Sequence, residues 1–308
     1  MLLTVTANPT IDKVYFVDRL KIGEVHRPLK VTASAGGKGI NVARVAKLLG
    51  EDSIALGFIG GSSGQFIKEE IIKLGIKEAF TCVKGESRTN FNISDNMGFS
   101  TELLESGPSV SKEETNALLE QFKAFADNSD IICVSGSLPK GADSSLYKNF
   151  IKIAKTKNKK IIVDTSGKVM LDIIDEAPFM IKPNKDELFD LLGFEAKDEA
   201  DIKKALLTLY DKGIALPIIT LGKDGAYAYI DNKFYRFHSP TVKVKNAVGS
   251  GDSTVAGIAV GISRGLCFKD AIMLGMACGV ANTQFDETGF VSKKSVDMYL
   301  NEIKYEII

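Results

Sequence analysis

From residue 112 onward, the chain alternates between stretches with helical periodicity and short apolar stretches typical of buried strands. Leu118, Phe122 and Phe125 mark one face of a helix, and an apolar strand follows at 131–134. Repeated strand and helix units of this size predict a parallel sheet with helices on both faces. We expect strands at 2–6, 53–59, 131–134, 161–163, 179–182 and 218–221, helices at 42–49, 66–74, 146–154, 187–192 and 202–209, and a hairpin at 226–237.

Two other segments have a different character. Short β-rich pieces occur at 14–17 and 25–31, and again at 88–94 and 99–104 around a turn at 95–98. Short alternating pieces that flank a turn indicate antiparallel strands. We therefore expect a single three-layer α/β/α domain over residues 1–308, with a mainly parallel sheet and a small β-sheet lid formed by about 10–34 and 85–107.

Polar residues and glycines follow the predicted strands. In open parallel sheets, ligands bind beyond the carboxyl ends of the strands. The residues at these positions are Asn8, Asp12, Ser135 to Ser137, Asp164, Lys182, Asn184, Thr220 and Gly222. The sequence therefore predicts a binding site along this edge of the sheet.

The charges of the chain balance, because 39 Lys and Arg residues oppose 39 Asp and Glu residues. A neutral chain without a basic stripe lacks the electrostatic footprint of a nucleic-acid-binding protein. No apolar run reaches the ~18 residues of a membrane helix, and the first residues enter a strand pattern without an export signal. The four cysteines have no metal-binding spacing. We expect a cytoplasmic protein that binds neither nucleic acid nor a membrane.

The stretch from Asn246 to Thr254 places Gly-Ser-Gly-Asp before a long apolar run that predicts a buried helix. Free backbone N–H groups and the helix dipole make a helix N-terminus a binding site for phosphate. Asp252 would repel an anion there, which suits a base that takes a proton from a hydroxyl attacking that phosphate. An ordinary capped helix is the simpler alternative, because Ser and Asp are common N-caps.

A second glycine-rich turn, Ser34 to Asn41, precedes the helix expected at 42–49. Its Lys38 could hold another phosphate together with Arg88, or could be a solvated lysine beside a surface ion-pair arginine. Asn184 and Glu187 could hold the Mg²⁺ of a nucleotide, which needs few protein ligands, or could be a loop residue and the acid of a helix's first turn. Taken together, these groups indicate a phosphotransferase that acts on a small alcohol already carrying a phosphate.

These motifs resemble those of the ribokinase/PfkB family of sugar kinases, and the resemblance extends over the whole chain. The matching segments are Asn8-Pro9-Thr10-Ile11-Asp12, Gly36-Gly37-Lys38-Gly39-Ile40-Asn41, Lys182-Pro183-Asn184 with Glu187, and Val248-Gly249-Ser250-Gly251-Asp252. The resemblance implies a ribokinase-like fold, ATP as phosphoryl donor with Mg²⁺, and Asp252 as the catalytic base.

Within this family, the chain is most similar to the branch that contains tagatose-6-phosphate kinases and 1-phosphofructokinases. Segments 101–108, 249–257 and 288–291 look closer to the tagatose-6-phosphate kinases. The resemblance therefore implies ATP-dependent phosphorylation of a ketohexose phosphate, D-tagatose 6-phosphate to D-tagatose 1,6-bisphosphate. Fructose 1-phosphate is the alternative substrate. A non-catalytic sugar-phosphate or nucleotide sensor is the alternative from another class.

The resemblance also assigns roles to individual residues. The N–H groups of Gly249, Ser250 and Gly251 would stabilise the transferred phosphoryl group. The substrate would contact Asp12, Gly36, Gly37, Lys38, Asn41, Arg88 and Ser137. The nucleotide would contact Lys182, Asn184, Thr220, Gly222, Lys223, Gly225 and Asn282, and Glu187 would bind Mg²⁺ through water.

Two further expectations concern ions and assembly. Asn246-Ala247 departs from the Asp-Thr of many family members, so a monovalent-cation site is not carried over. A small β-sheet has exposed edges that invite pairing, and family members often pair there. We therefore expect a homodimer joined through the lid.

Overall fold

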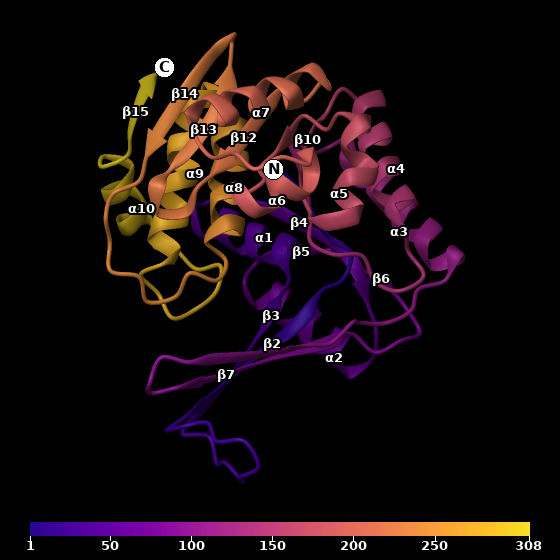
Figure 1. The fold of residues 1–308 in the computed structure, drawn as a ribbon. Helices are drawn as coiled ribbons and strands as arrows, with labels where there is room; N and C mark the ends of the chain where they lie inside the picture. The colour runs from indigo at the N-terminus through magenta and orange to yellow at the C-terminus, as the bar shows by residue number, and fades with distance from the viewer.

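The computed structural model describes all 308 residues and contains two sheets (Figure 1). The large sheet has eleven strands in the order β15-β14-β13-β12-β11-β10-β9-β1-β4-β5, and β6 also pairs with β4. Its parallel part consists of β1 (Leu2–Thr6), β4 (Ser53–Ile59), β5 (Lys77–Glu78), β6 (Thr81–Cys82), β9 (Ile131–Ser135), β10 (Lys160–Asp164), β11 (Met180–Ile181) and β12 (Leu216–Thr220). An antiparallel extension adds β13 (Ala226–Ile230), β14 (Lys233–His238) and β15 (Lys304–Ile307).

Helices cover both faces of the large sheet, so the three-layer prediction is confirmed. Successive strand residues point to opposite faces, and Leu3 joins one apolar core while Leu2 joins the other. The first core includes α3 (Lys112–Ala126), α4 (Ser144–Thr156), α5 (Gly167–Ile173), α6 (Lys185–Leu192) and α7 (Glu199–Asp211). The second includes α1 (Lys38–Leu48), α8 (Ser250–Ser263), α9 (Phe268–Asn282) and α10 (Lys293–Leu300). None of the helices is both long and apolar enough to span a membrane.

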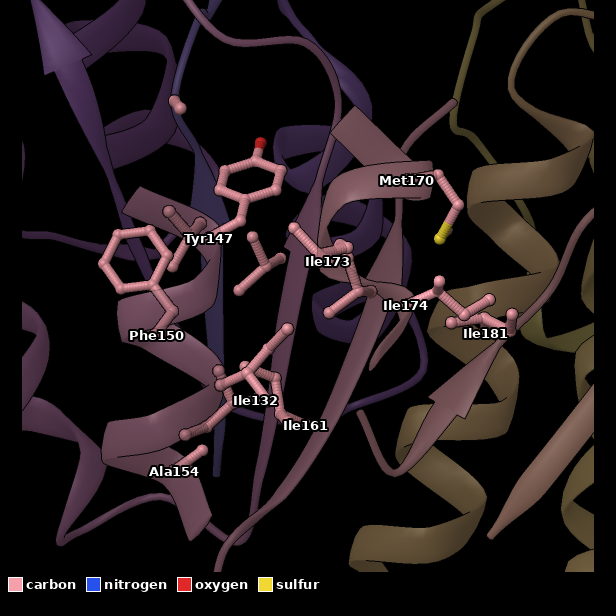
Figure 2. Close-up of a cluster of buried hydrophobic side chains, with 14 of the residues drawn as sticks. Ile132, Tyr147, Phe150, Ala154, Ile161, Met170, Ile173, Ile174 and Ile181 are labelled. Atoms are coloured by element: carbon pink, nitrogen blue, oxygen red, sulfur yellow. The ribbon is translucent and has the colours of Figure 1, made fainter. Parts of the chain in front are cut away.

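The first core extends to the edge of the sheet where the polar residues gather. Figure 2 shows Tyr147 and Phe150 of α4 packed beside Ile132 and Ile161 of the neighbouring strands. Tyr147 is fully buried, and its hydroxyl donates a hydrogen bond to the carbonyl oxygen of Gly136 at 3.1 Å. Because Gly136 directly follows β9, this bond fixes the carboxyl end of that strand to the core.

The second sheet contains four strands in the order β3-β2-β7-β8, and it extends away from the main body (Figure 1). Its strands are β2 (Thr10–Val17), β3 (Lys30–Gly36), β7 (Arg88–Asp95) and β8 (Ser100–Leu104). The prediction that two distant segments pair into a small separate sheet is therefore confirmed.

Two expected boundaries were wrong by five residues, and β2 and α1 each begin four residues earlier than expected. The strand expected at 25–31 lies at 30–36, because β3 pairs with β2 only from Lys30 onward. The helix expected at 66–74 is α2 (Gly61–Lys73) and begins five residues earlier. Its first turn is capped by Glu86, whose carboxylate accepts hydrogen bonds from the N–H groups of Ser62 and Ser63. A cap donated from such a distance in the sequence leaves no local signal.

Helices α8 and α9 pack with their backbones in close contact. A Cβ atom added to Gly257 would lie 2.6 Å from the Cα of Gly275. One added to Gly279 would lie 2.3 Å from Oγ1 of Thr254, which itself bonds the Ser250 carbonyl oxygen in the first turn of α8. This contact fixes the N-terminus of α8. Helix α9, which supplies it, was not predicted from the sequence.

Candidate active site

A cleft of about 510 Å³ lies between the carboxyl ends of several parallel strands and one face of the small sheet. Residues from distant parts of the sequence meet in it. The predicted site residues that line it are Asp12, Gly37, Lys38, Asn41, Arg88, Ser137, Lys182, Asn184, Glu187, Gly249, Gly251 and Asp252.

The N-terminal turn of α8 forms one wall of the cleft. Gly249 is the N-cap residue, with a left-handed φ of 81°, which favours glycine, and no side chain caps the helix. The N–H of Ser250 donates to the carbonyl oxygen of Ala247 at 3.2 Å. The N–H groups of Gly249, Gly251 and Asp252 have no acceptor within the protein. These three are therefore the free donors, which corrects the predicted set because the turn itself uses Ser250.

Asp252 lies in the first turn of α8 and is only 7% exposed. Its Oδ2 accepts a hydrogen bond from the amide of Asn41 at 2.8 Å. Burial raises the pKa of this carboxyl group to about 6, and the charge of Asp164 acts in the same direction. The Asn41 hydrogen bond and the charges of Lys38 and Lys182 oppose the rise. Such a group is ionised at neutral pH and basic enough to accept a proton. It caps nothing, so an ordinary capped helix does not explain it.

Lys38 begins α1 and extends toward the end of β10. Its Nζ lies 3.3 Å from Oδ2 of Asp164, a carboxylate that is 5% exposed. Burial lowers the pKa of Lys38, but the carboxylates of Asp164, Asp252 and Glu187 outweigh this effect and raise it above its ordinary value. Lys38 is therefore a permanent cation on the cleft wall, not a solvated lysine at a helix start.

The small sheet supplies the opposite wall. The register of β2 and β7 places Asp12 beside Asn90, whose amide donates to Oδ1 of Asp12 at 3.1 Å. Burial raises the pKa of Asp12, against the effects of this bond and of Arg88. The guanidinium of Arg88 donates to the carbonyl oxygens of Asn8 at 3.1 Å and Glu105 at 3.2 Å, and it has no carboxylate within ion-pair distance. Its charge is therefore held in place and available to an anion.

Asn184 and Glu187 form the capping box of α6. Each side chain accepts a hydrogen bond from the backbone N–H of the other at 2.9 Å. Only Oε2 of Glu187 is used, so Oε1 has no partner in the protein, and Glu187 lines the cleft. Mg²⁺ prefers carboxylate oxygens and keeps several waters. One free carboxylate oxygen in a polar cleft fits that requirement, with Asp164 as a second carboxylate on the wall.

Several predicted residues do not line the cleft. Gly36 packs against Asp12, because a Cβ atom there would lie 1.9 Å from Oδ2 of that carboxylate. The predicted nucleotide contacts at and after the end of β12 are also absent from the cleft wall. These contacts are Thr220, Gly222, Lys223 and Gly225. Thr220 adjoins a residue of the wall, because it forms a β-bridge with Asn184.

The expectation for Asn282 is not supported by the geometry. Its side chain is fully buried, donates to the carbonyl oxygen of Val248 at 2.9 Å, and accepts from Ser253 and from the N–H of Phe290, both at 3.2 Å. Its amide therefore holds the turn that precedes α8, and no part of it reaches the surface to contact a nucleotide.

Sequence reasoning assigned no role to two polar residues that contact the site. Asn90 follows Arg88 by two residues and so faces the same side of a strand, and Arg44 follows Asn41 by three and so shares its helix face. Both spacings were visible in the sequence. The groups that these side chains contact across the site were not visible, because they lie in distant segments of the chain.

The comparison with known protein families decides the class of this site. The sequence pattern of the family described as pfkB family carbohydrate kinase matches residues 4–294. The chain belongs to the pfkB family of carbohydrate kinases. This carbohydrate kinase is 37% identical over 307 residues to a tagatose-6-phosphate kinase of Staphylococcus epidermidis, and the match covers 99% of both chains. The family predicted from the motifs is therefore confirmed.

Solved structures support the same fold. A protein of Staphylococcus aureus provisionally assigned as a phosphofructokinase is 35% identical, with a TM-score of 0.87 over 100% of this chain and 99% of the other. A possible 1-phosphofructokinase of Thermotoga maritima is 26% identical, with a TM-score of 0.91 over 100% and 99%. Phosphofructokinase-2 of Escherichia coli is 24% identical, with a TM-score of 0.93 over 98% of both chains, and shows the fold alone.

Proposed function

We propose that this kinase transfers the γ-phosphoryl group of ATP to a primary hydroxyl of a ketohexose phosphate, and that its substrate is D-tagatose 6-phosphate. The observation that carries the proposal is the composition of the cleft. It combines a buried base, Asp252, with three free backbone donors in the same helix turn and three cations, Lys38, Arg88 and Lys182, on its walls. The choice of sugar is supported by the full-length similarity to a tagatose-6-phosphate kinase.

Asp252 acts as the general base. An alcohol with a pKa near ~16 is scarcely ionised before reaction, so the carboxylate accepts its proton as the new P–O bond forms. Asn41 holds Oδ2 of Asp252 through its amide, which leaves Oδ1 for the hydroxyl of the sugar. The phosphoryl group is transferred to that hydroxyl oxygen, and ADP leaves with the electron pair of the broken P–O bond.

The first turn of α8 stabilises the charge on the transferred group. The free N–H groups of Gly249, Gly251 and Asp252 point from a helix N-terminus, where the dipole favours negative charge. One such donor contributes about 3–4 kcal/mol to transition-state stabilisation in favourable cases. Glu187 would hold Mg²⁺ through water, and that ion would supply positive charge against the phosphates of the nucleotide.

The substrate phosphate binds to the cations of the cleft. Arg88 is held by two backbone carbonyl oxygens and lacks a carboxylate partner, so an incoming phosphate replaces water and not an ion pair. Lys38 is shared between this anion and Asp164. Asp12 and Asn90 lie side by side on the paired strands β2 and β7, and they orient the sugar hydroxyls.

Fructose 1-phosphate remains a candidate substrate, because a possible 1-phosphofructokinase of Thermotoga maritima shares the fold over the whole chain. A sensor without catalysis needs neither a buried base of raised pKa nor unoccupied donors beside it. The deciding test is ADP release with Mg-ATP on tagatose 6-phosphate, fructose 1-phosphate and fructose 6-phosphate in parallel. A kcat/KM about tenfold higher on tagatose 6-phosphate supports the proposal. A preference for fructose 1-phosphate overturns only the choice of sugar, and no turnover of any of the three overturns the proposal itself.

We also propose that two copies associate through the small sheet, which acts as a lid over the cleft. Large apolar side chains are exposed on this sheet and its loops, among them Val25 at 88%, Leu29 at 70% and Phe99 at 71%. Clustered exposed apolar residues of this kind mark association surfaces. Sedimentation equilibrium at micromolar concentration tests the proposal. A monomeric wild type contradicts it, and so does a dimer that Phe99→Ser leaves unchanged.

A further inference from the structure

Arg44 is a buried cation next to the site but outside the cleft. It lies on α1 one helical turn after Asn41 and is 8% exposed. Its Nη1 donates to Oδ1 of Asn41 at 2.8 Å and to the carbonyl oxygen of Thr288 at 3.0 Å, and Nη2 donates to the carbonyl oxygen of Ala35. Two backbone carbonyls from different segments therefore fix the guanidinium in one place.

This contact fixes which end of the Asn41 amide faces Asp252. A guanidinium has donors and no acceptor, so only the amide oxygen of Asn41 can face Arg44. The NH₂ group of Asn41 must then point the other way, where it donates to Oδ2 of Asp252 at 2.8 Å. An NH₂ group stabilises an ionised carboxylate. A proton on Oδ2 would instead need an acceptor, and the amide oxygen of Asn41 faces away from Asp252, toward Arg44.

We propose that Arg44 is a positioning residue that acts through Asn41 to keep Asp252 ionised, with Oδ1 directed to the sugar hydroxyl. The proposal rests on the assignment of Asp252 as the base. The role of Arg44 differs from those of Lys38 and Lys182, because those two cations line the cleft and can change partners when phosphate binds. Arg44 does not line the cleft and keeps its partners throughout the reaction.

The charged surroundings agree with this assignment. Asp252 is faced by Lys38 at the start of α1, Lys182 after β11, and Asp164 at the end of β10. Arg44 is faced by Asp252, by Asp12 on β2 and by Glu70 on α2. Removal of Arg44 takes away a positive charge that faces Asp252, and it also frees the Asn41 amide to rotate. Both changes favour the protonated form of Asp252.

The test compares Arg44→Met, Arg44→Lys and a control, Arg264→Met, in the full-length enzyme. Arg264 lies at the opposite end of α8 and also donates to a backbone carbonyl oxygen, that of Leu49. We expect Arg44→Met to lower kcat roughly 10- to 100-fold, as small misplacements of catalytic groups do. The Kd for ATP should change less than about threefold, because Arg44 touches no ligand. Arg44→Lys should recover part of the loss, and Arg264→Met should keep wild-type kcat.

The pH dependence separates positioning from a merely structural role. The acid limb of kcat should move upward by about one pH unit in Arg44→Met, since the base then protonates more readily. A sugar phosphate itself titrates near pH ~6, but equally for every variant, so the displacement between variants is the measurement. In an Asn41→Ala background, the Arg44→Met change should add no further displacement, because the route through Asn41 is already broken.

Three results would overturn the proposal: an acid limb that does not move, a displacement that adds to that of Asn41→Ala, or a loss of kcat that matches the loss of folded protein measured by circular dichroism. If Arg44→Met does not fold, the comparison of Arg44→Lys with Asn41→Ala carries the same test. Wild-type turnover is measured first. Its absence would refute the proposed function, whereas normal wild-type turnover with unshifted variants refutes only the role of Arg44.

Discussion

Replacement of Asp252 by asparagine should make the protein more stable while it abolishes most of the activity. The pKa of Asp252 rises from an ordinary 3.8 to about 6 because the carboxylate is buried. The folded state therefore binds this proton more tightly than the unfolded chain, and the native state loses stability as pH rises between these two values. Asparagine is neutral at every pH and can still accept the hydrogen bond from Asn41, so it escapes this loss.

The size of the gain follows from the same pKa values. Each pKa unit corresponds to about 1.4 kcal/mol, so the ionised carboxylate costs the native state about 3 kcal/mol once both states are ionised. The gain from Asp252→Asn should be about 3 kcal/mol near pH 8 and about 1.5 kcal/mol near pH 5. In the same protein, kcat should fall by about 10²- to 10⁴-fold, the usual contribution of a general base.

Urea unfolding of the wild type and Asp252→Asn at several pH values measures the gain directly. Asp297→Asn is the matched control, because Asp297 is an exposed residue on α10 whose carboxylate forms no hydrogen bond or ion pair. A variant no more stable than wild type near pH 8, or a gain that does not change with pH, would refute the reasoning that burial strains this carboxylate.

Three further predictions concern other parts of the site. Arg88→Met should raise the KM for the sugar phosphate roughly 10- to 100-fold and leave the KM for ATP unchanged, since a charged hydrogen-bond donor is lost only from the sugar side. Initial rates measure both KM values, and a change confined to the KM for ATP contradicts the assignment. Glu187→Gln keeps an oxygen for the Asn184 capping bond but loses the charge, so the Mg²⁺ concentration for half-maximal activity should rise about tenfold with little change in Tm. A lower Tm with an unchanged Mg²⁺ requirement would make Glu187 a capping residue only. Gly279→Ala places a Cβ atom 2.3 Å from Oγ1 of Thr254, so it should destabilise the protein by about 1–3 kcal/mol and lower kcat. Differential scanning calorimetry measures the stability and initial rates measure kcat. An unchanged kcat would show that α9 does not set the position of the α8 turn.

Local sequence signals predicted the features of the fold that depend on neighbouring residues. The start of α8 follows from the Gly-Ser-Gly sequence before an apolar run, and α6 begins where Asn184 and Glu187 lie three residues apart. Features that depend on distant residues were missed. The start of α2 depends on Glu86, and the strand expected at 25–31 was displaced by its pairing with β2.

The same distinction applies to the site. Motifs placed Lys38, Asn184 and Asp252 in one cleft, because each motif combines a glycine-rich turn or a strand end with a functional side chain. They could not show which N–H groups remain free, since the Ser250 N–H is used by a turn that only the backbone geometry reveals. Nor could they show that a helix residue such as Arg44 bonds the carbonyl oxygen of Thr288.

The cleft is built by two separate sheets, and this division has a consequence for how such enzymes change over evolution. Groups proposed to contact the sugar phosphate, among them Arg88 and Asn90, lie on strands of the small sheet. The proposed base and the free donors lie on a helix packed against the large sheet. A lineage can therefore acquire a new sugar through substitutions in a peripheral sheet that contributes to neither of the two large cores. The residues proposed to transfer the phosphoryl group need not change with them, so substrate range and chemistry are free to diverge at different rates.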